Sequence, residues 1–120
     1  MASGAIKKTT NLTLLAVAKN PHHTLGALYN KTLRVLQKMP ETSSYRKYTE
    51  QIVEERALHV QTEPNVAKLE EKINCGQIEE VIIQAENELN LARRMLAWKP
   101  WEPLCQVPPS NQWKWPIGKV

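Results

Sequence analysis

A chain of 120 residues with 42% hydrophobic residues and a net charge of +4 has room for one small domain, but not for two independent cores. Its longest apolar run, within residues 12–18, is far shorter than the roughly 20 residues that a membrane-spanning helix needs. The basic residues come without any RNP, zinc-finger or recognition-helix pattern, which argues against a nucleic-acid-binding protein.

Residues 1–20 form an N-terminal arm that contains lysines and hydroxyl residues but no acidic residue. Three interpretations remain open for it. Lys7 and Lys8 followed by residues 12–18 resemble a secretory signal, whereas the lack of acidic residues is typical of an organelle-directing segment. The third interpretation is an ordinary arm that packs along the rest of the domain.

Residues 21–99 predict an all-α domain. Pro21 suits the first position of a helix, and Pro40 ends that helix. Its apolar positions recur with helical spacing: Leu25, Leu28, Tyr29, Thr32, Leu36 and Met39. A cap within residues 42–44 begins a second helix, whose expected apolar side comprises Tyr45, Tyr48, Thr49, Ile52, His59 and Val60.

A short third helix follows Pro64, and Gly76 suits the left-handed position after its end. The fourth helix lies within residues 77–101 and is stopped by Pro100. One face of it carries Ile78, Val81, Ile82, Ala85, Leu89, Ala92 and Leu96. Glu79 and Glu80 favour the N-terminal end of the helix dipole, and we expect such neighbouring glutamates to be solvated. The prediction is a small antiparallel bundle of three main helices and one short helix.

Two apolar features remain outside that core. Leu91, Met95 and Trp98 are spaced four and three residues apart, but they point away from the core stripe. Residues 100–120 form an extended Trp/Pro-rich tail that contains Trp101, Trp113 and Trp115. Because tryptophans carry large apolar areas, we expect this tail to cover its own bundle, a partner protein, or both.

Catalytic chemistry finds little support. A Ser-His-Asp triad is excluded because the sequence has no aspartate. We expect His22 and His23 to be solvent-exposed residues of a first helical turn, and Cys75 and Cys105 to be free thiols. We therefore predict no catalytic, cofactor-binding or metal-binding residue, and an interaction module is favoured over an enzyme.

Five blocks in order resemble one family. They are NPH at residues 20–22, YRKYTEQ at 45–51, AENELNLAR at 85–93, WKPWEPL at 98–104 and QWKWP at 112–116. Together they are similar to the family of 13-kDa accessory subunits (alpha subcomplex subunit 5) of mitochondrial NADH:ubiquinone oxidoreductase, respiratory complex I. The similarity extends over nearly the whole chain.

The resemblance implies a non-catalytic accessory subunit without cofactors. Such a subunit would support the matrix arm that passes electrons from NADH to ubiquinone, peripheral to the mitochondrial inner membrane on its matrix side. Its partners would be other subunits of the peripheral arm, without nucleic acid, membrane span or homo-oligomer. The resemblance also implies an uncleaved N-terminus, with removal of Met1 and acetylation of Ala2.

We predict that Leu91, Met95, Trp98, Trp101, Trp113 and Trp115 form the partner interface. Such a surface would let the Trp-rich tail act as a clamp on a neighbouring subunit. The alternative function is a free soluble helical adaptor that binds another protein through the same tail.

Overall fold

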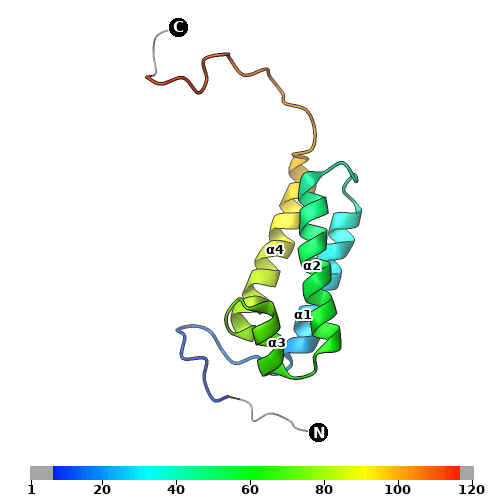
Figure 1. The fold of residues 1–120 in the computed structure, drawn as a ribbon, viewed down its shortest axis with the longest axis vertical. Helices are drawn as coiled ribbons and strands as arrows, with labels where there is room; N and C mark the ends of the chain where they lie inside the picture. The colour runs from blue at the N-terminus through cyan, green and yellow to red at the C-terminus, as the bar shows by residue number, and fades with distance from the viewer. Residues whose placement is uncertain (1–6, 117–120) are drawn as a thin grey trace.

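The structure is a computed structural model that describes residues 7–116, so the predicted changes at Met1 and Ala2 lie outside the described residues. Its regular elements are α1 (Pro21–Gln37), α2 (Ser44–Thr62), α3 (Val66–Ile73) and α4 (Ile78–Trp98). Each main helix reverses the direction of the one before it, so α1 and α4 run the same way (Figure 1). The helical bundle predicted from the sequence is confirmed for this part of the chain.

Local chemistry fixes the ends of the helices. Pro21 occupies the first turn of α1, and the Ser43 hydroxyl caps α2 by accepting from the backbone N–H of Arg46 at 3.4 Å. α1 ends at Gln37, and its last turn tightens before Pro40 is reached. The left-handed cap of α3 is Asn74, with φ 56°, and not Gly76 as predicted. Gly76 takes a positive φ of its own in the loop that follows.

The core lies where α1 packs against both α2 and α4. The residues that form it come from all four helices: Leu25, Tyr29, Val53, Val60, Leu69, Ile78, Val81 and Ala85. Burial of each large aliphatic side chain contributes roughly 1.5–3 kcal/mol, so this cluster is the main source of stability. The predicted core stripes of α1 and α4 are confirmed.

The predicted core side of α2 was partly wrong. Thr49, Val53 and Val60 are buried, but Tyr48 and Ile52 are exposed. α2 packs on α1, whereas it touches α4 little. The buried side is therefore narrower than the apolar positions suggested, and it leaves part of α2 uncovered.

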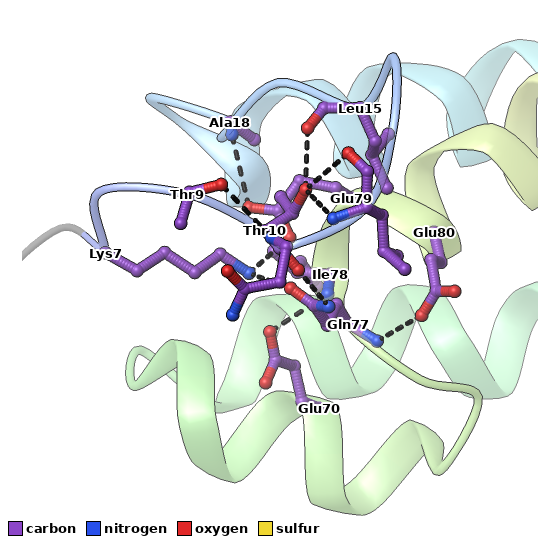
Figure 2. A network of polar contacts seen from close by, with 12 residues as sticks. Lys7, Thr9, Thr10, Leu15, Ala18, Glu70, Gln77, Ile78, Glu79 and Glu80 are labelled. Atoms are coloured by element: carbon purple, nitrogen blue, oxygen red, sulfur yellow. Dashed lines mark hydrogen bonds and ion pairs between the residues drawn. The ribbon is translucent and has the colours of Figure 1, made fainter.

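The described part of the N-terminal arm is held against the start of α4 (Figure 2). The Lys7 ammonium lies 2.6 Å from Oε2 of Glu79, and the backbone N–H of Ala18 donates to Oε1 of the same carboxylate at 3.2 Å. The Gln77 side chain joins this network, because it donates to the Thr10 carbonyl at 2.9 Å. Residues 7–18 thus close over the end of a helix that lies 60 residues or more away in sequence.

Glu79 was predicted to be solvated, and that prediction was wrong, since only 3% of the residue is exposed. Burial by itself would raise the pKa of this carboxyl. The hydrogen bond from Lys7 and those from backbone N–H groups outweigh burial and hold the pKa of Glu79 below its usual value. Glu79 is therefore a buried carboxylate that depends on its partners.

Candidate interaction surface

The predicted patch on α4 is present on the surface of the bundle. Leu91 and Trp98 are exposed and Met95 is half-buried, while the neighbouring Leu89 and Ala92 face the core. The patch thus lies beside the core face of the same helix. It brings together three of the six residues predicted to form an interface.

The other three predicted residues lie in the tail, which leaves the bundle beyond the end of α4 (Figure 1). Trp113 is 90% exposed and Trp115 is 83% exposed, while Trp101, close to the helix end, is half-buried. Hydrogen bonds within the tail are local turns, such as the one from Gln112 N–H to the Pro109 carbonyl. Within residues 100–116 the tail therefore does not cover its own bundle, and two indole rings are left to water.

A groove between α2 and α4 was missed by the sequence analysis. Its volume is about 420 Å³, and its floor is made by α1, through Tyr29 and Thr32. Ile52 forms one rim and Leu91 the other. The available signal was the position of Ile52 and Arg56 on the same helical face as the buried Thr49 and Val53.

Some polar groups of this groove have hydrogen-bond partners and others do not. Arg56 of α2 donates to the Gln84 side chain at 3.2 Å and to the Cys75 sulfur at 3.2 Å. The Tyr29 hydroxyl is buried without a hydrogen-bond partner among the described residues. Burial raises the pKa of Tyr29, and Arg56, through its charge and as a nearby donor, only partly opposes this. The hydroxyl therefore keeps its proton at neutral pH, and that proton has no acceptor among the described residues.

A second hydrogen bond, besides the one from Arg56 to Gln84, crosses from α2 to α4 beside the groove. The Tyr45 hydroxyl donates to Oε1 of Glu88 at 2.5 Å. Burial and the adjacent Glu88 carboxylate both raise the pKa of Tyr45. Of the two charged side chains that line the groove, Glu88 is bonded to Tyr45, and Arg56 is the one that acts on Tyr29.

The histidines and cysteines have structural surroundings. The ring of His22 lies 2.7 Å from the Glu63 carbonyl and is half-buried, so the prediction of a solvent-exposed residue was wrong for His22. Cys75 accepts from Arg56, and both Cys75 and Cys105 are free thiols, as predicted. Between residues 7 and 116, no group of three or more His, Cys, Asp or Glu side chains is placed to hold a metal ion.

A sequence model described as the conserved region of an ETC complex I subunit matches residues 14–80. This match covers the end of the arm, helices α1 to α3 and the first residues of α4.

Similarity to individual proteins extends further. The chain is 59% identical over 115 residues to the NADH dehydrogenase [ubiquinone] 1 alpha subcomplex subunit 5 of Bos taurus, covering 96% of this chain and 99% of that protein. It is 50% identical over 111 residues to a probable alpha subcomplex subunit 5 of Caenorhabditis elegans, covering 92% and 74%. A probable subunit 5 of Arabidopsis thaliana, named as mitochondrial, is 38% identical over 96 residues, covering 80% and 57%.

Proposed function

The chain belongs to the ETC complex I subunit family, and from this premise we propose that it is a non-catalytic accessory subunit of mitochondrial respiratory complex I. The observation that carries the proposal is the similarity over 96% of the chain to proteins named as alpha subcomplex subunit 5. In this role the chain supports the assembly or stability of the arm that passes electrons from NADH to ubiquinone. It binds other subunits of that arm and carries no electron itself.

The proposed place is the peripheral arm, on the matrix side of the inner membrane. Within residues 7–116, no helix is long and apolar enough to cross a bilayer. The basic arm of residues 1–20 directs the chain to the organelle and stays attached, with Met1 removed and Ala2 acetylated. The intact mass of the chain isolated from mitochondria tests this part, and loss of the first 18 residues would contradict it.

The non-catalytic role agrees with how the reactive side chains are used. His22 bonds a backbone carbonyl and Cys75 accepts from Arg56, so both serve the packing of the bundle. The surfaces left over are apolar and aromatic, which suits protein binding.

The partner surface comprises the α4 patch and the tail, that is Leu91, Met95, Trp98, Trp101, Trp113 and Trp115. Exposed tryptophans are strong binding anchors, and truncation of one commonly weakens binding by about 2 kcal/mol or more. The tail acts as a clamp on a neighbouring subunit, while the bundle positions it.

The first test is a native gel of detergent-solubilised mitochondria, probed for the chain and stained for NADH dehydrogenase activity. Migration with the large active band is expected. Migration as a small free species would contradict the proposal and favour a separate helical adaptor.

The clamp is tested by the double variant Trp113→Ala, Trp115→Ala, expressed in cells that lack the native chain. Incorporation into complex I should fall, while the melting temperature of the isolated chain should not, because both rings are exposed. Val107→Ala, an exposed aliphatic in the same tail, is the matched control and should incorporate normally. Full incorporation of the double variant would show that the tail is no clamp.

A further inference from the structure

We propose that the groove between α2 and α4 seats an amphipathic helix of a neighbouring complex I subunit, with a carboxylate on that helix facing Tyr29 and Arg56. The inference rests on the proposed function, and it adds a second binding surface with its own chemistry. The two surfaces share Leu91, but Ile52, Tyr29 and Arg56 belong only to the groove.

The shape of the groove favours a helix. α2 and α4 both pack on α1 but touch each other little, so the side of the bundle between them is open. On α2 the lining residues recur at Thr49, Ile52, Val53 and Arg56, which is the spacing of one helical face over about two turns. A helix of the partner in this position would lie beside α1, α2 and α4 and would complete the arrangement of a four-helix bundle. This is a common way of covering such a groove.

Apolar residues on both rims specify an apolar stripe on the occupant. Ile52 is 53% exposed on α2, and Leu91 is exposed on the facing side of the groove. Val53 and Ala85 extend the apolar lining toward the floor. A partner that covers these residues removes them from water, which is the usual driving force of helix-in-groove binding.

The floor of the groove indicates which polar group the partner helix should carry. Tyr29 is 3% exposed, and its hydroxyl has no hydrogen-bond partner in the part of the chain that the structure describes. A buried hydroxyl without a partner is unfavourable, so a group that accepts its proton is favoured there.

Arg56 and Glu88 both line the groove. The positive charge that acts on Tyr29 is that of Arg56, whereas the Glu88 carboxylate accepts from Tyr45. A carboxylate would accept from the Tyr29 hydroxyl and pair with the Arg56 guanidinium, while a lysine or arginine in the same place would be repelled. This charge complementarity selects an acidic residue within the apolar stripe of the partner.

The experiment replaces the native chain in cells by full-length variants and measures the fraction that migrates with active complex I. Ile52→Glu places a negative charge on the rim and should reduce incorporation about tenfold or more. Leu58→Glu is the matched control, because Leu58 lies on the same helix, is 56% exposed and does not line the groove. Its incorporation should stay within about twofold of the unchanged chain.

Tyr29→Phe tests the polar group separately, since it keeps the ring and removes only the hydroxyl. The variant should dissociate from complex I several-fold faster, while the isolated chain should melt no lower because the hydroxyl proton has no acceptor among the described residues. Retention equal to that of the unchanged chain would overturn the carboxylate contact. A melting temperature that falls together with retention would assign the hydroxyl to folding and overturn it as well.

The outcomes separate this inference from the proposed function. If the unchanged chain does not migrate with complex I, the proposed function fails. If it does, and Ile52→Glu and Leu58→Glu incorporate equally, the groove inference fails and the proposed function stands. If the isolated chain dimerises and Ile52→Glu abolishes the dimer, the groove is occupied by a second copy and the inference is overturned.

Discussion

The Lys7 ammonium lies 2.6 Å from the Glu79 carboxylate, although 72 residues separate them in the sequence. Glu79 is buried, while the Lys7 side chain is 36% exposed. The ion pair joins the N-terminal arm to the first turn of the longest helix. Because the carboxylate is buried, this pair should affect both the stability of the chain and its dependence on pH.

Lys7→Met should lower the free energy of unfolding by about 1–2 kcal/mol. Removing one partner of a buried pair leaves an uncompensated charge, and the exposure of Lys7 reduces the effect below that of a fully buried pair. Urea unfolding measures the change, and hydrogen exchange of the Ala18 N–H should become faster because it bonds the same carboxylate. Lys8→Met is the control, since Lys8 is exposed. Equal losses in the two variants would mean that the contact adds no stability.

The same pair makes stability depend on acid. The pKa of Glu79 is lower in the folded chain than its ordinary value of 4.5. The stabilisation is therefore fully present above pH 4.5 and is lost as the pH falls through the native pKa of Glu79. Glu79→Gln should be less stable at neutral pH and should lose less stability on acidification. Part of the pH dependence of stability should remain in Glu79→Gln, because Lys72 also lowers the pKa of Glu63. Urea unfolding at several pH values checks this, and an unchanged slope would contradict it.

Replacement by alanine should have opposite effects on stability at Gly76, which lies in a loop, and at Gly26, which lies within α1. Gly76 has φ +89°, and a Cβ there would lie 2.3 Å from Oε2 of Glu80, the atom that accepts from Gln77 N–H. Gly76→Ala should destabilise the chain by about 1–2 kcal/mol. Gly26 lies within α1 with nothing near its Cβ position, so Gly26→Ala should stabilise by about 0.5–1 kcal/mol. Thermal unfolding of both variants gives the comparison, and two changes of the same sign would refute it.

The helices could be predicted because their signals are local. Pro21, Ser43 and Pro100 mark the ends, and the spacing of apolar residues in α4 identified its core face. In α2 the same reasoning failed, because Tyr48 and Ile52 follow a helical spacing that the fold leaves uncovered. Which of two overlapping stripes is buried depends on where α4 lies, and the sequence of α2 contains no information on that.

The candidate surfaces divide in the same way. The α4 patch could be predicted from the helical spacing of its apolar residues in the sequence. The tail could be predicted from its cluster of tryptophans. The groove and the burial of Glu79 depend on contacts between residues far apart in sequence, as in the bond from Lys7. A carboxylate in a first helical turn is usually solvated, and only the path of the arm shows why this one is not.

Tyr45→Phe should affect stability most at neutral pH and least at high pH. The Tyr45 hydroxyl donates to Glu88, and the loss of a hydrogen bond to a charged group at a half-buried site lowers the free energy of unfolding by about 1 kcal/mol. Because the pKa of Tyr45 is raised above its ordinary value of 10.0, the contribution is present below pH 10.0 and is lost as the pH rises toward the native pKa.

The difference between Tyr45→Phe and the unchanged chain should therefore shrink above pH 10.0, as measured by urea unfolding at pH 7 to 11. Tyr48→Phe is the matched control on the same helix, because its exposed ring stays in place while its hydroxyl is removed. Since Tyr45 and Glu88 connect α2 to α4 beside the groove, weakening this bond should also let the two helices move apart. Faster exchange of α2 and α4 amides in Tyr45→Phe than in Tyr48→Phe would support that connection, and equal exchange would show that this hydrogen bond does not set the width of the groove.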